Sequence, residues 1–222
     1  MFANAASTTA LRGAARTFST RAAGTARAMP RFSLAATAAA SLAVAGVSLW
    51  SMPGVQLEGP RTIAGEYKTA SERSFVMIKP DGVSRQIVGK IIDRFESRGY
   101  KLVAIKSVVP SQELARQHYK DLSHKPFYPA LVSYITSGTP VVAMVWEGKD
   151  VIRQGRRMVG ATNPLEADPG SVRGQYAVSV GRNIIHASDG HDSATDEIGL
   201  WFNEGELAEY EPVAWPMVMA DN

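Results

Sequence analysis

Apolar residues alternate between strand spacing and helix spacing along the chain from Ser74 onward. The stretch SFVMIKPDG (74–82) is rich in β-formers and predicts a buried strand that Pro80-Asp81-Gly82 ends in a turn. Apolar positions at helical spacing, followed by a glycine stop, then predict a helix over 84–99. A second strand is predicted over 100–109, where the sequence reads YKLVAIKSVV.

Six further segments continue this pattern toward the C-terminus. They are a helix over 111–122, a helix over 126–138, a strand over 140–148, a helix over 149–160, a short strand within 180–189 and a helix over 193–202. Ser111 and Ser193 are the expected N-caps of two of these helices, and the helix over 126–138 is expected to follow Pro129. The alternation predicts a compact α/β sandwich with one small sheet.

Composition adds limits to this picture. The chain has 222 residues, of which 45% are hydrophobic and 20% charged, so it can bury the core of one ordinary domain and still carry an extension. It contains no cysteine, which excludes disulfides and cysteine-ligated zinc.

Charge is distributed unevenly between the N-terminal region and the remainder. Residues 1–57 contain five arginines and no acidic residue, and without those five charges the net charge of +3 becomes −2 for the rest. The sequence pI of 9.2 therefore reflects the leader. A nucleic-acid partner is not expected, because the predicted domain carries no net positive charge.

The composition of residues 1–31 is that of an organelle transit peptide, rich in Ala, Arg, Ser and Thr and free of acid. RTFST (16–20) resembles a mitochondrial processing site, although a chance match in such a segment is the alternative. We therefore expect a mitochondrial protein of the intermembrane space or inner membrane, with the thylakoid lumen of a chloroplast as the alternative.

An uncharged apolar segment follows at 32–50, within the leader 1–57. As a helix it would span roughly 28 Å, close to the thickness of a bilayer core. It is either a membrane anchor, which would allow inner-membrane association, or a sorting signal that is cleaved; a packed helix of the fold is the third reading. Prolines and glycines then predict a linker, which we place at 58–73, ahead of a domain over 74–222.

Glycine-based phosphate sites are absent from the sequence. Gly82, Gly89 and Lys90 do not have Walker A spacing, no G-x-G-x-x-G follows a predicted strand, and the G-x-S-x-G nucleophile motif is missing. Phosphate binding would therefore need side chains, and Arg156 and Arg173 have the planar fork that suits it. Each of them could equally be an ordinary surface arginine.

Five blocks in register identify a family. KPDGV, HYKDL, VVAMVWEG, GATNP and GRNIIHASD, in this order, resemble nucleoside diphosphate kinases, and the resemblance covers 74–222. It implies a ferredoxin-like α/β (α+β) sandwich, a four-stranded sheet with helices packed on it. It also implies that His186 takes the γ-phosphate of a nucleoside triphosphate such as ATP and passes it to a diphosphate by ping-pong kinetics, which maintains triphosphate pools. A buried core histidine is the alternative for His186, and His118, His124 and His191 are interpreted as ordinary.

The resemblance assigns further roles to matching residues. Glu197 would bond one ring nitrogen of His186, with Ser188 supporting Glu197 and Tyr119 near the nucleophile. Lys79 and Asn183 would bond the sugar hydroxyls, and Lys79 could also stabilise the transferred phosphoryl group. The phosphate-binding residues would be Arg156, Thr162 and Arg173, and Phe127 and Val180 would sandwich the base, which stacking alone reads with little selectivity.

The resemblance also implies Mg²⁺ bound between nucleotide phosphates with few or no protein ligands, and a homo-oligomer, most often a hexamer, with the loop around Pro164 near subunit contacts. Two positions depart from the family pattern: Ala187 replaces a glycine after the nucleophile, and Thr139 is an extra residue in the SGTP turn. Alanine would cost up to ~1 kcal/mol if that backbone needs positive φ. Rival functions are a membrane-tethered scaffold and a lipid- or nucleic-acid-binding role.

Overall fold

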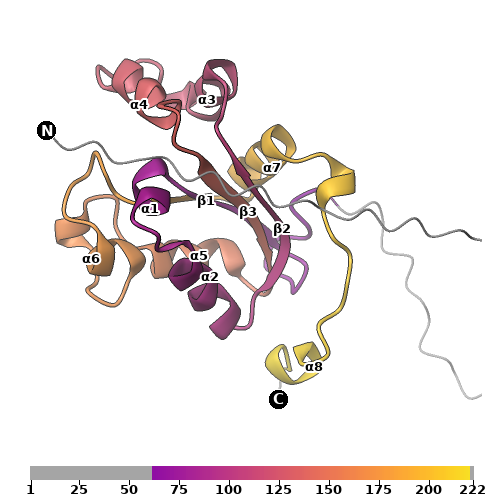
Figure 1. The fold of residues 1–222 in the computed structure, drawn as a ribbon. Helices are drawn as coiled ribbons and strands as arrows, with labels where there is room; N and C mark the ends of the chain where they lie inside the picture. Colours follow the sequence, from indigo (N-terminus) through magenta and orange to yellow (C-terminus); the bar gives the residue numbers. More distant parts are fainter. Residues whose placement is uncertain (1–61, 221–222) are drawn as a thin grey trace, which may run out of the picture. The chain divides into compact units, whose positions relative to one another are not determined.

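A four-stranded antiparallel sheet forms the centre of residues 62–220, the part of the chain that the computed structural model describes (Figure 1). Its strands lie in the order β2-β3-β1-β4. They are β1 (Arg73–Ile78), β2 (Lys101–Val108), β3 (Val141–Glu147) and β4 (Ile185–Ala187). All three pairings are antiparallel. The predicted ferredoxin-like sandwich is confirmed.

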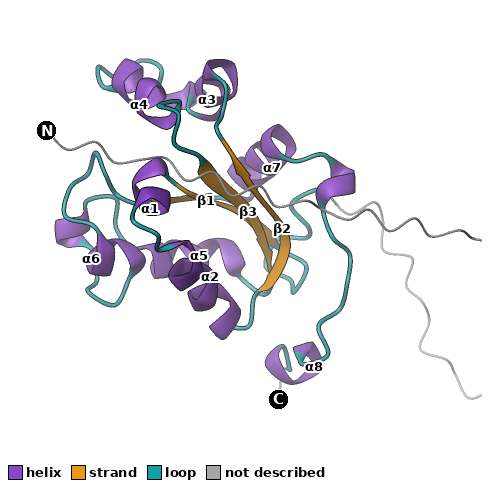
Figure 2. Ribbon diagram, in the orientation of Figure 1, coloured by secondary structure: helices purple, strands orange, loops and turns teal. Residues whose placement is uncertain are grey.

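Helices cover both faces of this sheet (Figure 2). They are α1 (Pro80–Ser84), α2 (Val88–Ser97), α3 (Gln112–His118), α4 (Tyr128–Ile135), α5 (Val151–Val159), α6 (Val172–Tyr176), α7 (His191–Trp201) and α8 (Trp215–Val218). Short 3₁₀ turns occur in the connections at Lys120–Leu122, Pro164–Glu166 and Glu204–Glu206.

Two local predictions were wrong. The expected turn at Pro80-Asp81-Gly82 is the helix α1, because proline fits the first helical position without losing a hydrogen bond. Ser193 is not the N-cap of α7, which begins at His191. It lies in the first turn, and its Oγ accepts a hydrogen bond from the Gly190 N–H at 2.9 Å.

The side chains of β1 point alternately to the two faces of the sheet, so they contribute to two separate parts of the hydrophobic core. Phe75 and Met77 pack against α3, α4 and α7, whereas Val76 and Ile78 pack against α2, α5 and α6. All four side chains are fully buried, as expected for a central strand. Because His186 of β4 is paired with Met77, its side chain points to the face covered by α3 and α7.

The segment before β1 packs against the sheet. Ala64 and Glu72 are fully buried, and the Arg73 N–H donates to the Ala64 carbonyl at 2.8 Å. One oxygen of Glu72 accepts from the Lys68 N–H at 2.9 Å and the other from the Ile152 N–H at 3.0 Å, in the first turn of α5. Residues 62–73 of the expected linker are thus packed on the domain.

The leader and its apolar segment 32–50 lie outside the described residues, among which no helix is long and apolar enough to cross a membrane.

A buried ion cluster joins β1, β2 and β3 at one end of the sheet. Glu147 accepts from Arg73 Nε at 2.6 Å and pairs with Lys101 Nζ at 2.5 Å. Lys101 also donates to the Tyr210 carbonyl at 2.9 Å and lies 4.8 Å from the ring centre of Trp215. The cluster therefore also attaches the C-terminal segment to the sheet.

We expect Glu147→Ala to lower the free energy of unfolding by about 3–5 kcal/mol, because it leaves two buried cations without their partner. The control is Asp196→Ala, which breaks the exposed Lys120–Asp196 pair and should cost less than about 1 kcal/mol. Urea unfolding followed by circular dichroism measures both. Equal losses would contradict the role of the cluster.

Candidate active site

His186 lies in the middle of β4 with its ring on the α3–α7 face, 24% of its side chain exposed. Its ring centre is 6.1 Å from that of Phe75 on β1 and 4.7 Å from that of His118 at the end of α3. Strand pairing holds the backbone and aromatic rings hold the imidazole. The ring is therefore fixed in orientation yet open to solvent along one edge.

Glu197 of α7 determines which nitrogen of His186 is free. Its Oε1 is 2.7 Å from His186 Nε2, and its Oε2 accepts from Ser188 Oγ at 2.5 Å. Ser188 is fully buried and also accepts from the Phe75 N–H at 3.2 Å. A carboxylate accepts only, so the ring proton lies on Nε2 and the lone pair on Nδ1. This is the arrangement of an oriented nucleophile.

The apolar face of α7 brings Glu197 to this position. Ala194, Ile198 and Trp201 recur at helical spacing and are buried against the sheet. Glu197 sits beside this face, at the edge of the core, where its carboxylate reaches β4. The expected partnership of His186, Glu197 and Ser188 is therefore present in the geometry.

Two residues at the end of α3 enclose the nucleophile. Interpreting His118 as ordinary was wrong, since its ring stands edge-on to His186 at an interplanar angle of 80°. Burial, and then His186, lower the pKa of His118 well below its usual value, so it is neutral. Burial, and then Glu197, raise the pKa of Tyr119, which keeps its proton. Within the described chain the Tyr119 hydroxyl has no hydrogen-bond partner.

His118, His186 and Glu197 form the only group of metal-ligating type within residues 62–220, with ligand atoms within 4.8 Å of one another. Trp201 Nε1 donates to His118 Nδ1 at 3.2 Å, which places the proton of neutral His118 on Nε2. A metal bound to Nε2 would move that proton to Nδ1, and the Nδ1–H would then face the Trp201 N–H, so that two donors oppose each other. The group is therefore better suited to orienting a nucleophile than to holding a metal.

A strained turn precedes the nucleophile. Ile184 has φ +71°, and the Ile185 N–H donates to the Asn183 carbonyl at 2.8 Å, two residues back. Positive φ at a β-branched residue costs about 1–3 kcal/mol and survives only where the surroundings enforce it. On the other side of this turn, Asn183 Oδ1 accepts from Lys79 Nζ at 2.8 Å. The turn thus links the nucleophile to the Lys79–Asn183 pair.

Lys79 and Arg173 are cations that have lost much of their water. Burial, followed by the nearby Arg173, lowers the pKa of Lys79 to about 8. Burial, followed by Arg156, lowers the pKa of Arg173 to about 10. Arg173 donates to three carbonyls, of Asn183, Gly160 and Ile185. A guanidinium has five N–H groups, so these three bonds use the Nε N–H and one N–H of each terminal nitrogen.

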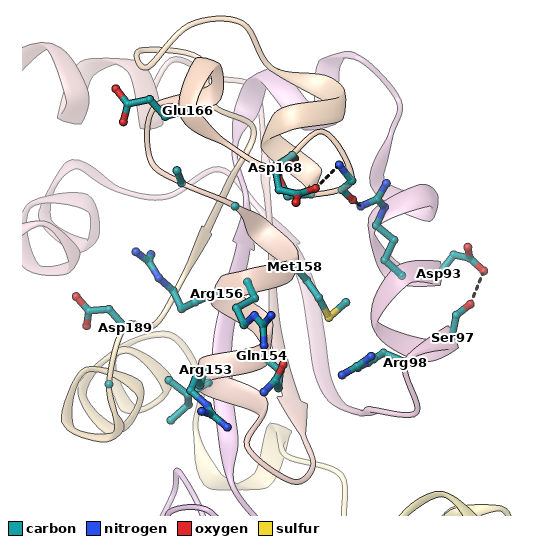
Figure 3. Close-up of a pocket in the computed structure, with 18 of the residues that line it drawn as sticks. Asp93, Ser97, Arg98, Arg153, Gln154, Arg156, Met158, Glu166, Asp168 and Asp189 are labelled. Carbon is teal, nitrogen blue, oxygen red and sulfur yellow. Dashed lines mark hydrogen bonds between the residues drawn. The ribbon is translucent and has the colours of Figure 1, made fainter.

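Arg156 and Thr162 extend this positive region. Arg156 Nη1 donates to the Ala187 carbonyl at 3.3 Å, directly beside the nucleophile, and the Thr162 carbonyl accepts from Asn183 Nδ2 at 3.0 Å. Figure 3 shows Arg156 projecting from α5 on the same side as Asp189, at one end of a groove of about 1350 Å³. Asp93 of α2 and Arg98, which directly follows that helix, line the opposite side of that groove (Figure 3).

The two expected base-stacking residues are at the periphery. Phe127 is the N-cap of α4 and Val180 lies between α6 and β4, and both are about half exposed.

Of the two departures from the family pattern, Ala187 lies in β4 and does not have a positive φ, so alanine carries no backbone strain there. Thr139 lies in the turn before β3, next to Gly138 at φ +96°.

The site thus combines three features: a histidine whose Nδ1 carries the lone pair, a carboxylate bonded to the other ring nitrogen, and three cationic side chains nearby. A phosphotransferase with a histidine nucleophile needs these groups. A model of the family described as nucleoside diphosphate kinase matches residues 72–207. The chain belongs to the nucleoside diphosphate kinase family and is an enzyme of that class, as its sequence blocks predicted.

Known proteins support this assignment over different parts of the chain. It is 58% identical over 143 residues to the nucleoside diphosphate kinase of Drosophila yakuba, covering 64% of this chain and 95% of that protein. It is 46% identical over 207 residues to nucleoside diphosphate kinase 4, chloroplastic, of Spinacia oleracea, covering 85% of this chain and 86% of that one. The structure of a halophilic nucleoside diphosphate kinase from Halobacterium salinarum in complex with CDP has a TM-score of 0.65 and 46% identity, covering 67% of this chain and 98% of that one.

We expect the free energy of unfolding of the native chain to rise between pH 8 and 10.5 relative to Lys79→Met. The unfolded lysine, with its usual pKa of 10.5, holds its proton through this window while the folded one, at about 8, has released it. Stability therefore increases as pH rises through the folded pKa, by about 3 kcal/mol in total. Urea titrations at several pH values measure the difference.

The control for this effect is Lys125→Met at an exposed position, which should follow the native pH profile. Superimposable profiles of the native chain and Lys79→Met would contradict the desolvation of Lys79.

Proposed function

We propose that this enzyme transfers the γ-phosphoryl group of a nucleoside triphosphate to a nucleoside diphosphate through phospho-His186. The Glu197 bond to Nε2 carries the proposal, because it leaves Nδ1 as the nucleophile. The Nδ1 lone pair attacks the γ-phosphorus, the bond to the β–γ bridging oxygen breaks, and the diphosphate leaves with its electrons. A second diphosphate then takes the phosphoryl group by the reverse step, which gives ping-pong kinetics.

Glu197 and the cations have separate tasks in this scheme. Attack makes the imidazole positive, and the carboxylate of Glu197 stabilises that charge while the Nε2 proton stays in place. Lys79, Arg156 and Arg173 offset the negative charge on the phosphoryl oxygens, and Thr162 belongs to the same phosphate region. Tyr119, which remains protonated, offers a neutral donor beside the ring. Asn183, held by Lys79, supports binding of the sugar hydroxyls.

The exposure of Phe127 and Val180 supports an open base site. Apolar stacking accepts every base, because each has a π-face. We therefore expect little selectivity among bases, with affinity coming from the sugar and phosphate contacts. The CDP bound in the Halobacterium salinarum relative is consistent with a site that admits a pyrimidine nucleotide.

Mg²⁺ enters as part of the substrate. The residues assigned to the phosphates are three cations and a threonine, and the nearby carboxylates Glu197 and Asp81 each have both oxygens engaged within the protein. Magnesium prefers oxygen ligands and retains several waters. The donor set therefore fits an ion held by the nucleotide phosphates rather than by the protein.

Incubation with γ-labelled ATP and Mg²⁺ but no acceptor tests the proposal. We expect label that is labile to acid and stable to alkali on the native chain, and its release on addition of a diphosphate. His186→Ala should carry none, whereas His124→Ala, at an exposed histidine, should label normally. A folded native chain that takes no label would contradict the proposal and leave a scaffold role.

Self-association is supported by apolar side chains exposed on the described surface. Leu165, next to the buried Pro164, is 78% exposed and Val178 is 81% exposed. Among the strands of residues 62–220, β2 is an edge strand with a neighbour on one side, and Ile105 on it is also exposed. We infer a homo-oligomer, of six subunits by family resemblance, with the loop around Pro164 at subunit contacts.

We expect Leu165→Asp to lower the mass of the assembly, because a carboxylate would be buried at a subunit contact. Native mass spectrometry measures it, with Ser123→Asp at an exposed loop position as the charge control. A monomeric native chain, or an unchanged mass for Leu165→Asp, would contradict the inferred contact.

The N-terminal region is the basis for a proposed cellular location of the protein. The match to the chloroplastic Spinacia oleracea protein covers 85% of this chain, which is more than residues 74–222, so it extends into the N-terminal region. We infer that this region is a targeting extension. The chloroplast is favoured over the mitochondrion, for which RTFST is the only support.

A further inference from the structure

The backbone carbonyl and the backbone N–H of the strained residue Ile184 both form hydrogen bonds with the segment Lys79–Asp81. The Lys79 N–H donates to the Ile184 carbonyl at 2.7 Å, and the Ile184 N–H donates to Asp81 Oδ2 at 3.0 Å. Ile184 is fully buried, so neither group could turn to water instead. The start of α1 therefore enforces a conformation that isoleucine does not adopt on its own.

Helix α1 also lies unusually close to this turn. A Cβ at Gly82 would be 3.2 Å from the Ile184 carbonyl oxygen, 3.2 Å from its Cγ2 and 2.7 Å from Ile78 Cγ2. Only glycine permits this approach. The Asp81 side chain beside it reaches the Ile184 amide because the two backbones are in contact.

Asp81 is itself held in place by α4. The Tyr134 hydroxyl donates to Asp81 Oδ1 at 2.6 Å and accepts from the Asp81 N–H at 3.2 Å. The Arg182 guanidinium lies 3.9 Å from the centre of the Tyr134 ring, which ties the chain just before the turn to the same helix. Both oxygens of Asp81 are thus engaged within the protein, and neither is directed to a ligand.

The position of the turn matters for the reaction. On one side of Ile184, Asn183 holds Lys79; on the other, Ile185 and His186 begin β4 in register with Ile78 and Met77. If Ile184 relaxed to negative φ, the peptide planes on both sides would rotate. The nucleophile would then move relative to the Lys79–Asn183 pair.

We propose that Asp81 is a positioning residue for phosphoryl transfer: with Tyr134 it holds Ile184 in its strained conformation and so keeps His186 Nδ1 aligned with the phosphate region. The proposal rests on the function proposed above. Asp81 acts through the backbone and does not touch the nucleotide. Its effect therefore falls on the rate of transfer at saturating nucleotide.

The test measures single-turnover phosphorylation of His186 from saturating Mg·ATP in the full chain. We expect Asp81→Ala to slow it by about 10- to 100-fold, the loss that a small misplacement of a reacting group produces. Asp81→Asn should recover most of the rate, because its amide oxygen can still accept from the Ile184 N–H. Tyr134→Phe should slow the step less than Asp81→Ala and add nothing to it in the double variant.

Tyr128→Phe is the matched control, since Tyr128 lies on the same helix and its hydroxyl donates to the Arg116 carbonyl at 3.2 Å, in an exposed position away from Asp81. It should label at the native rate. Amide hydrogen exchange gives a readout besides activity: the Ile184 amide should exchange faster in Asp81→Ala and remain protected in Asp81→Asn. Urea unfolding identifies any variant that fails to fold.

Two results would overturn the proposal. One is a folded Asp81→Ala chain that labels within about twofold of the native rate. The other is an Asp81→Asn chain as slow as Asp81→Ala. Absence of label on the native chain would instead count against the proposed function, so the two failures are distinguishable.

Discussion

The bond between Glu197 and Nε2 of His186 is the interaction on which the chemistry of this site depends. It determines the tautomer of the ring, it orients the imidazole, and it places a negative charge where a positive one develops. Much of the surrounding structure supports that bond. Ser188 fixes the second oxygen of Glu197, the register of β1 and β4 fixes the backbone of His186, and the apolar face of α7 fixes the helix that carries the carboxylate.

The site is assembled at a cost to the stability of the fold. Lys79 and Arg173 are held where burial disfavours their charge, and Ile184 is held in a conformation that isoleucine avoids. Each of these features would be unfavourable in a protein selected for stability alone. Here they concentrate positive charge and a rigid backbone beside one free nitrogen. A polyanionic substrate offsets the repulsion among the cations, so the free site is less stable than the loaded one.

The sequence predicted the fold best where apolar periodicity is long. Enough residues to show a strand or helix periodicity of apolar positions are present in β1, β2, β3, α2 and α5. The helices α1, α6 and α8 have four or five residues each, too few for a periodic signal. The sequence blocks identified the family and a site geometry centred on His186 and Glu197. The contacts of His118 and Asp81 could not be predicted, because they arise from packing between elements that are distant in the chain. Both residues lie in the blocks HYKDL and KPDGV that identified the family, but a block of matching residues does not show which distant side chains each of them touches.

The most direct test of this account is the position of the phosphoryl group on the ring, read by ³¹P and ¹H NMR of the phosphorylated enzyme. Because Glu197 occupies Nε2, the phosphoryl group should be found on Nδ1 of His186. Phosphorylation at Nε2 would mean that the bond to Glu197 does not set the reactive nitrogen, and would contradict the central claim.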